Sequence, residues 1–185
     1  MIPRLKKIYQ EEIMPSLTKT LSIKNTMQVP KLEKIVLNMG LGLDASDSKI
    51  LKSIQTDLGN LTGQLPVVTK SKKAVANFKT RKDIPLGLKV TLRKNNMYYF
   101  LDRLINTALP RIKDFRGLNP DSFDQEANYS FGIKEHVIFP EVNFDKIEKM
   151  RGLDITVVTS TKNKEASKAL LDSFTIREKL GEVAG

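Results

Sequence analysis

The sequence contains no cysteine and no tryptophan, and it has a single histidine, His136. Without cysteine the chain forms no disulfide, no zinc–thiolate site and no thiol nucleophile. One histidine also excludes a metal site built from several histidines of one chain. Because His136 stands between Glu135 and the apolar run VIF, with no serine or cysteine partner nearby in sequence, we expect a structural histidine rather than a catalytic one.

Long apolar runs are missing as well. None approaches the roughly 20 residues that span a bilayer, and the basic start MIPRLKKIYQEE is followed by no apolar signal core, so we expect neither a membrane span nor secretion. Glu11 and Glu12 in the first helical segment argue against binding to an anionic membrane surface. Carboxylates are scattered and no paired-acid motif stands out, and apart from one glycine-rich string at residues 40–45 we expect no metal, no cofactor and no small-molecule substrate.

Acidic residues are too few to balance the basic ones. The chain has 31 Lys and Arg against 21 Asp and Glu, which gives a formal charge of +10 and a pI of about 9.7. This excess favours a polyanionic partner, either nucleic acid or an anionic membrane surface. With 185 residues, of which 40% are hydrophobic, the chain is long and apolar enough for a folded core.

One stretch, KSKKAVANFKTRK at residues 70–82, has no acid at all before Asp83. It has too few large apolar residues to be a core element, and its like charges repel one another. A solvated surface loop is the alternative, but ordinary surfaces mix both signs of charge. The stretch therefore predicts a loop that contacts phosphates, with one aromatic residue to stack or anchor it. The residues are Lys70, Lys72, Lys73, Phe78, Lys79, Arg81 and Lys82.

Hydrophobic periodicity predicts alternating helices and strands. Helices are expected over 4–21 (interrupted near Pro15), 44–61, 96–109 and 164–174, with a short helical piece at 143–150. Strands are expected over 31–40, 64–70, 86–94 and 154–161, and strand-like residues over 129–139. No repeat or composition break marks a second domain. We therefore expect one α+β domain over residues 1–178, which includes an extended basic loop at 70–83, and a flexible tail at 179–185.

Each clear strand is apolar on one face only. Ile35, Leu37 and Met39 point one way and Lys34, Val36 and Asn38 the other, and the other strands repeat the alternation. If helices cover the apolar face of a mainly antiparallel sheet, the opposite face stays open and basic, and suits a sugar–phosphate backbone. The alternative is that any half-solvated antiparallel sheet looks like this. The polar set is Lys34, Asn38, Lys89, Thr91, Arg93, Thr156 and Ser160.

A competing hypothesis comes from GLGLDA at residues 40–45, which follows a strand, precedes a helix and matches the G-x-G-x-x-A form of a dinucleotide fingerprint. Asp44 would place a carboxylate beside the pyrophosphate. The next candidate acid, Asp57, falls inside the following helix instead of at the end of a second strand. A tight strand-to-helix connection at Gly40 and Gly42 is the simpler interpretation.

Several longer strings follow one another in a recognisable order. They are LNMGLG (37–42), TGQLPVVTKSKKAVANFKTR (62–81), GLKVTLR (87–93), PRIKDFRGL (110–118), NYSFGI (128–133), IFPE (138–141) and RGLDIT (151–156). Together they closely resemble the 5S rRNA-binding family of large-subunit ribosomal protein five, in its bacterial-type spacing. The resemblance runs from the first helix to about Phe174. A match of many strings in order is far more specific than any single motif.

The resemblance implies a non-enzymatic constituent of the cytoplasmic ribosome, although an organellar ribosome is not excluded. It implies that the protein attaches 5S rRNA to the central protuberance, beside 23S rRNA. The implied 5S rRNA-binding residues are Lys34, Asn38, Gln64, Lys89, Thr91, Arg93 and Thr156. The implied partner of the basic loop is the P-site tRNA, and residues 110–148 correspond to a bridge to small-subunit ribosomal protein thirteen. A free-standing RNA chaperone without sequence preference is the alternative.

Overall fold

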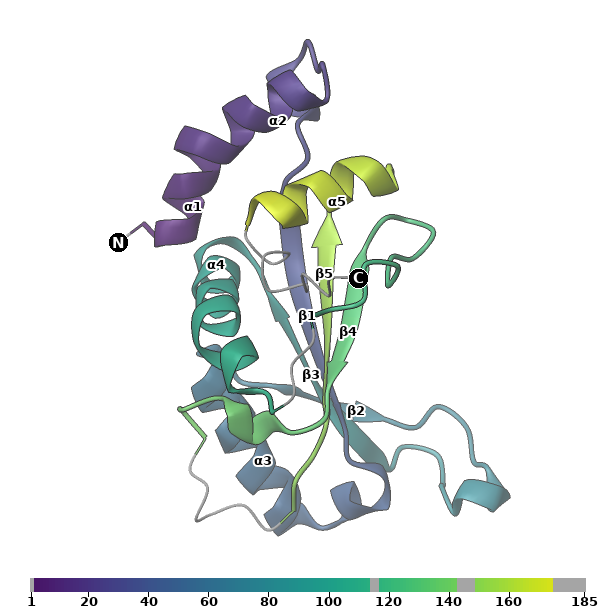
Figure 1. Cartoon of the computed structure of the whole chain (residues 1–185). Helices are drawn as coiled ribbons and strands as arrows, with labels where there is room; N and C mark the ends of the chain where they lie inside the picture. The colour runs from purple at the N-terminus through teal and green to yellow at the C-terminus, as the bar shows by residue number, and fades with distance from the viewer. Residues whose placement is uncertain (1, 114–116, 143–148, 175–185) are drawn as a thin grey trace. The chain divides into compact units, whose positions relative to one another are not determined.

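Five strands form one open sheet in the order β2-β3-β1-β5-β4 (Figure 1). The computed structural model describes residues 2–113, 117–142 and 149–174. The sheet is antiparallel and is accompanied by helices, so the predicted α+β class is confirmed. The strands are β1 (Leu32–Gly40), β2 (Val67–Lys70), β3 (Pro85–Leu92), β4 (Tyr129–Ile133) and β5 (Leu153–Thr159).

The principal helices are α1 (Arg4–Ile8), α2 (Met14–Thr20), α3 (Ser48–Thr62), α4 (Lys94–Arg103) and α5 (Lys164–Ser173). Two wider π-helical turns occur, η1 (Tyr9–Ile13) and η5 (Leu104–Ala108). The short 3₁₀ turns are η2 (Thr26–Gln28), η3 (Gly42–Ser46), η4 (Ala76–Phe78), η6 (Leu109–Arg111) and η7 (His136–Ile138).

The chain divides into two compact units. The first unit comprises Met1–Ile35, Arg93–Phe131 and Thr156–Gly185, and the second comprises Val36–Leu92 and Gly132–Ile155. Strands β1, β4 and β5 each have residues in both units. The single domain at 1–178 stays a prediction, and the predicted tail at 179–185 lies outside the described residues.

In the first unit, Pro15 determines where the first helix changes its winding. Proline has no N–H to donate to the carbonyl four residues earlier, and the wide turn η1 lies directly before it. The helix nevertheless continues, so the predicted interruption is a change of winding rather than a break. Tyr9 on this turn is buried, donates a hydrogen bond to the Pro30 carbonyl (2.9 Å) and stacks on Phe174.

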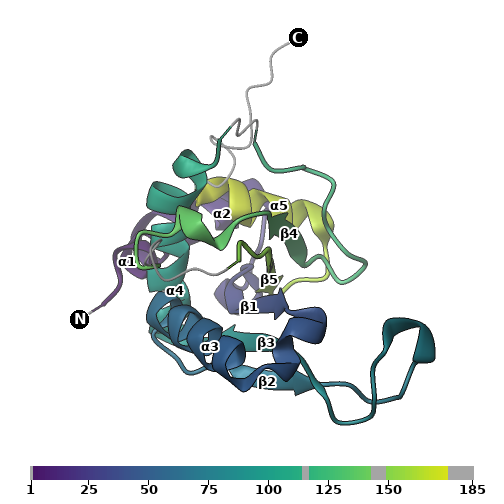
Figure 2. The same cartoon turned by 90° about the horizontal axis from the view of Figure 1, so that it is seen from below.

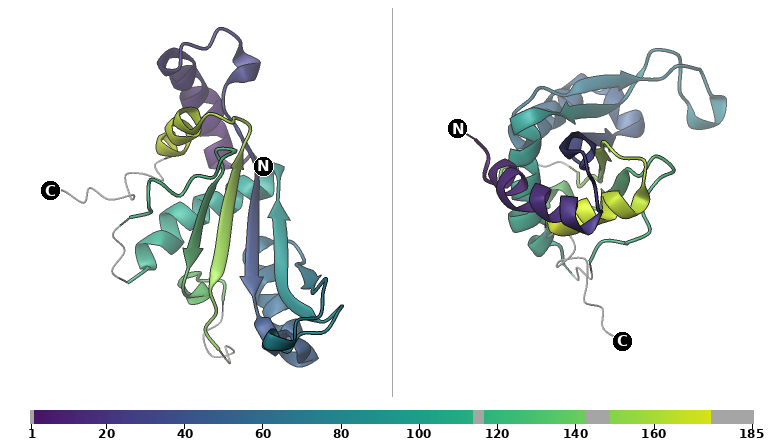
Figure 3. Two further views of the ribbon diagram at one scale, coloured as in Figure 1. Left: turned by 90° about the vertical axis from the view of Figure 1, so that its right-hand side faces the viewer. Right: turned by 90° about the horizontal axis from the view of Figure 1, so that it is seen from above.

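The remaining helices of the first unit complete its core. α1 packs against α4, and α5 lies next to the helix formed by α1, η1 and α2 (Figure 3). All six residues that the sequence predicted on the buried side of the fourth helix are buried: Met97, Phe100, Leu101, Leu104, Ile105 and Ala108. Burial raises the pKa of the Tyr9 hydroxyl to about 12, which suits a side chain that serves packing.

The second unit is built on the apolar faces of β1 and β3, where Leu37, Met39 and Leu88 are at most 1% exposed. α3 supplies Ile54, Leu58 and Leu61 to the same core. Asp47 caps the start of α3 by accepting a hydrogen bond from the Lys49 amide (2.8 Å). Gly63, with a φ of +68°, ends it. A long loop leaves this core between β2 and β3 (Figure 2).

Some boundaries differ from the prediction. β2 begins at Val67, so Gln64 and Pro66 precede the strand. β3 ends at Leu92, because Lys94 turns the chain with a φ of +53° and Arg93 becomes the residue before α4.

The strand-like interpretation of 129–139 is only half right. β4 stops at Ile133, and the 3₁₀ turn η7 follows at His136–Ile138. The His136 amide still bonds the Arg151 carbonyl (3.1 Å), and the His136 carbonyl accepts from the Phe139 amide (3.3 Å) within the turn. The helical piece predicted at 143–150 lies mostly outside the described residues, and Lys149 and Met150 are not helical.

Two glycines of the second unit give a paired test of packing. A Cβ atom on Gly87 would lie 2.6 Å from the Met39 carbonyl oxygen, whereas one on Gly40 would meet nothing within 4 Å. We expect Gly87→Ala to lower the free energy of unfolding by about 1–3 kcal/mol, because the backbone of β1 must move. Gly40→Ala should change it by less than about 0.5 kcal/mol. Urea unfolding measures both, and equal effects would contradict the close approach of β1 and β3.

Candidate nucleic-acid interface

The basic loop (residues 70–83) keeps its shape through backbone hydrogen bonds. At its base, the Ser71 amide bonds the Ile84 carbonyl (2.9 Å) and the Asp83 amide bonds the Ser71 carbonyl (3.0 Å). Nearer its tip, Val75 and Thr80 form an isolated antiparallel bridge with bonds of 3.1 and 3.2 Å. The 3₁₀ turn η4 closes the tip, followed by Lys79 in the left-handed conformation. The loop is therefore a hydrogen-bonded extension of the β2–β3 hairpin.

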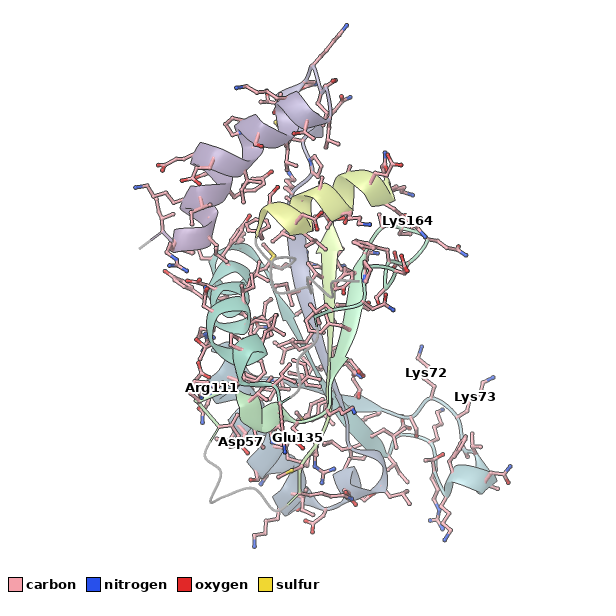
Figure 4. All side chains as sticks on the ribbon, in the orientation of Figure 1. Asp57, Lys72, Lys73, Arg111, Glu135 and Lys164 are labelled. Atoms are coloured by element: carbon pink, nitrogen blue, oxygen red, sulfur yellow. The ribbon has the colours of Figure 1, made fainter. Side chains whose placement is uncertain are left out.

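The six cations of the basic loop are all exposed. Lys72 and Lys73 extend into open space (Figure 4). Among the described residues, none of the six forms an ion pair, whereas cations elsewhere do, such as Arg4 with Asp102 at 2.8 Å. Phe78 is 72% exposed, so it does not anchor the loop to the core. The loop thus presents uncompensated positive charge beside an exposed aromatic ring, a combination that suits an RNA strand.

In the second unit, polar side chains of β1 and β3 point away from the buried face of their strands. Asn38 and Lys89 are exposed and Thr91 is half-buried. The Leu41 amide bonds the Leu86 carbonyl (2.9 Å), and this register, continued along β1 and β3, places Asn38 opposite Lys89. Val67 of β2 pairs with Lys89 and is 67% exposed, so it stands on the same face. The sequence analysis missed Val67, because a lone exposed valine gives no signal.

The other residues predicted to bind 5S rRNA lie at different places in the fold. Gln64 is exposed in the turn after α3, and its amide bonds the Thr62 hydroxyl (3.3 Å). In the first unit, Lys34 is half-buried on β1 and Arg93 is exposed before α4. The hydroxyl of Thr156 shares a hydrogen bond with Ser130 of β4 (3.0 Å), a partner that the sequence analysis did not single out.

Ser160 is exposed at the end of β5. Its amide donates to the Lys31 carbonyl and its hydroxyl accepts from the Lys31 amide, with distances of 3.0 Å each. This pairing ties the end of β5 to the start of β1 and leaves the hydroxyl proton of Ser160 as a donor. Its place on an RNA-binding face stays a prediction.

The dinucleotide hypothesis fails on the geometry of Gly40–Ala45. The strand before it belongs to an antiparallel sheet, and a short 3₁₀ turn separates it from α3. Asp44 accepts hydrogen bonds from Lys149 and from Arg151, each at 3.0 Å. Gly42 has a φ of +60°, a conformation that favours glycine, so the glycine at this position needs no nucleotide to explain it. Asp57 lies within α3, as predicted.

His136 is buried, and its Nδ1 atom lies 3.0 Å from the Arg151 carbonyl oxygen and 3.3 Å from the Arg151 amide. It joins two backbone segments, which confirms a structural role. Within the described parts of the chain, no group of acidic or histidine side chains gathers as a metal site does. Across the same residues, no helix has the length and apolarity to cross a bilayer.

Comparison with known proteins identifies the family of this protein. The model of the ribosomal protein L5 family matches residues 25–81, and that of the ribosomal L5P family C-terminus matches residues 85–177. The large ribosomal subunit protein uL5 of Pelagibacter ubique is 67% identical over 94% of this chain and 95% of its own length. This chain belongs to the ribosomal protein L5 family. The uL5 proteins of Dichelobacter nodosus (55%) and Clostridium botulinum (54%) each match over 92% of this chain, and over 96% and 95% of their own lengths.

Membership confirms the predicted resemblance and class. The chain is a structural constituent of the large ribosomal subunit, located in the cytoplasmic ribosome. Its relatives are named as ribosomal proteins, so the chain is not an enzyme. Binding to ribosomal RNA is typical of the L5 family.

The ion pairs of Asp44 make stability depend on pH. Hydrogen bonds from Lys149 and then Arg151 hold the pKa of the Asp44 carboxyl below its usual range. A depressed pKa in the folded state stabilises the fold above the unfolded pKa, and this stabilisation is lost as the pH falls through the folded value. We expect Asp44→Asn to lower Tm at about pH 7 and to have a smaller effect at about pH 2, because the lowered pKa places the loss of the ion pairs at acid pH.

Asp121→Asn is the control for this measurement, because Asp121 is exposed and forms no ion pair among the residues described. Its thermal unfolding should follow that of the unmodified protein at both pH values. A constant Tm difference for Asp44→Asn across the pH range would show that the ion pairs contribute nothing and that the amide merely disturbs packing.

Proposed function

We propose that this protein attaches 5S rRNA to the central protuberance of the large subunit, next to 23S rRNA. The observation that carries the proposal is the exposed pair Asn38 and Lys89 on neighbouring strands whose other faces are fully buried. An amide and an ammonium group at strand spacing suit phosphate and 2′-hydroxyl oxygens of an RNA backbone. The L5 family relationship supports the same assignment.

The proposed 5S rRNA-binding set keeps the seven residues that the sequence predicted. Lys34, Asn38, Lys89 and Thr91 lie on β1 and β3, and Thr156 lies on β5. Gln64 and Arg93 lie just outside strands. Four of these residues have no ion-pair or hydrogen-bond partner among the described side chains: Lys34, Asn38, Lys89 and Arg93. Their polar atoms are therefore available to RNA.

The basic loop has a second RNA partner in this proposal, the P-site tRNA. The uncompensated charge of the loop and the exposed ring of Phe78 support this assignment. The proposed bridge to small-subunit ribosomal protein thirteen involves residues 110–148, of which 114–116 and 143–148 lie outside the described residues. Exposed Pro110, Arg111 and Lys113 support a contact surface there.

The first experiment compares 5S rRNA with an unrelated structured RNA of equal length across a salt series. We expect Asn38→Ala combined with Lys89→Ala to weaken 5S rRNA binding by roughly tenfold, because charged hydrogen bonds are worth about 1–3 kcal/mol. Replacing Lys72, Lys73 and Lys79 with alanine should leave the preference for 5S rRNA intact. Lys52→Ala, at an exposed position on α3, is the matched control for loss of charge.

The alternative function, a free-standing RNA chaperone, gives a different result. Equal affinity for both RNAs, falling steeply with salt, would mean that backbone charge alone drives binding. That outcome would overturn the 5S rRNA assignment.

A second experiment measures the affinity of tRNA over the same salt range. Each phosphate contact adds about 0.7–0.9 to the slope of log K against log salt. Replacing Lys72, Lys73 and Lys79 should therefore reduce the slope by about two, while Asn38→Ala with Lys89→Ala should leave tRNA binding unchanged. A slope that does not depend on the loop lysines would contradict a tRNA contact at the basic loop.

A further inference from the structure

An apolar hollow of about 730 Å³ lies where the basic loop meets the turn η3, within the second unit. Four apolar side chains line it: Leu43 from η3, Val75 and Phe78 from the loop, and Leu86 from β3. Lys72 and Lys73 line it as well. Their ammonium groups extend away from the loop into open space (Figure 4), so the wall of the hollow is apolar and the positive charge stands beyond its rim.

The exposure of these apolar side chains is concentrated rather than scattered. Leu43 is 50% exposed, Val75 39% and Phe78 72%. Single exposed apolar residues are ordinary on protein surfaces, but several around one depression mark a binding surface. The packing of the core does not require them, because the loop is held by its own backbone bonds at Ser71 and between Val75 and Thr80.

The charge around the hollow decides what kind of ligand fits. A purely apolar partner would leave Lys72 and Lys73 without counter-charge, and no acid of the described chain pairs with them. A nucleotide unites a flat apolar base with an anionic phosphate. Unstacked bases of RNA bind proteins by stacking on aromatic rings, while lysines bind the flanking phosphates.

We infer that the hollow receives one unstacked base of an RNA strand, which stacks on Phe78 against Leu43 and Leu86. The phosphates on either side of that base lie against Lys72 and Lys73. This inference rests on the proposed function as an RNA-binding protein and deepens it. It turns the basic loop from a purely electrostatic contact into a site with a defined apolar pocket.

The test uses the full chain and a short single-stranded RNA that carries 2-aminopurine at one central position, whose fluorescence falls or rises as its stacking changes. Phe78→Ala should weaken binding at least about fivefold and abolish the fluorescence change on binding. Leu43→Ala should weaken binding in the same direction. Leu65→Ala is the matched control, because Leu65 is also 72% exposed in the second unit but does not line the hollow.

Further variants separate stacking from charge and from simple apolar contact. Phe78→Tyr keeps the ring and should restore binding, whereas Phe78→Leu should not. Phe78→Ala should leave the salt slope unchanged, while Lys72→Ala should reduce it by about 0.7 for a single strand. Thermal unfolding confirms that each variant is folded.

Two results would overturn the inference. One is equal binding by the Phe78→Ala and Leu65→Ala variants. The other is Phe78-dependent binding of an acidic peptide with no such dependence for the RNA, which would make the occupant a protein segment. Neither result depends on the preference for 5S rRNA, which Asn38 and Lys89 test separately. A result that overturns base binding in the hollow can thus be distinguished from one that overturns the proposed function.

Discussion

The burial of one face of each strand is the constraint on which the rest of the molecule depends. Ile35, Leu37 and Leu88 have no exposed surface, and their neighbours along each strand point the opposite way. Each fully buried aliphatic side chain contributes about 1.5–3 kcal/mol, so the register of β1 and β3 is strongly fixed. A slip by one residue would place Lys34, Asn38 and Lys89 in the core. The same alternation that builds the core therefore aligns the polar side chains on the opposite side of each strand.

Charge in this protein follows two different patterns. Asp44 joins two cations that are far apart in sequence, Lys149 and Arg151, and the Arg151 side chain is only 8% exposed. These pairs hold the turn η3 in place beside β1. In the basic loop the cations are exposed and form no ion pair within the described chain. The fold explains the first pattern, and only an anionic partner explains the second.

How much the sequence predicts depends on whether a feature is local. The strand faces and the buried side of α4 follow from periodicities of two and about 3.6 residues, and both were predicted correctly. The pairing of Ser160 with Lys31 could not be foreseen, because the two residues are 129 positions apart in sequence. The turn at His136–Ile138 was missed for a similar reason, since His136 is bonded to the distant Arg151 backbone.

The apolar hollow was beyond sequence analysis altogether. Leu43 and Phe78 come from segments that the sequence gives no reason to bring together, and each by itself is an unremarkable exposed residue. The family relationship, in contrast, was visible because its motifs occur in a fixed order along the chain. Order along the chain is a property of the sequence, whereas the wall of a hollow is a property of the tertiary structure.

In the basic loop, the backbone and the charged side chains have separate roles. Lys79 and Asp83 adopt positive φ values of 51° and 65°, which cost free energy for residues with a side chain. The bridge between Val75 and Thr80 and the bonds at Ser71 offset this cost without using any charged side chain. Six like charges in the same segment add repulsion that nothing in the described chain relieves. The backbone therefore sets the position of the loop, and its charges stay uncompensated, available to the RNA phosphates that we propose as its partner.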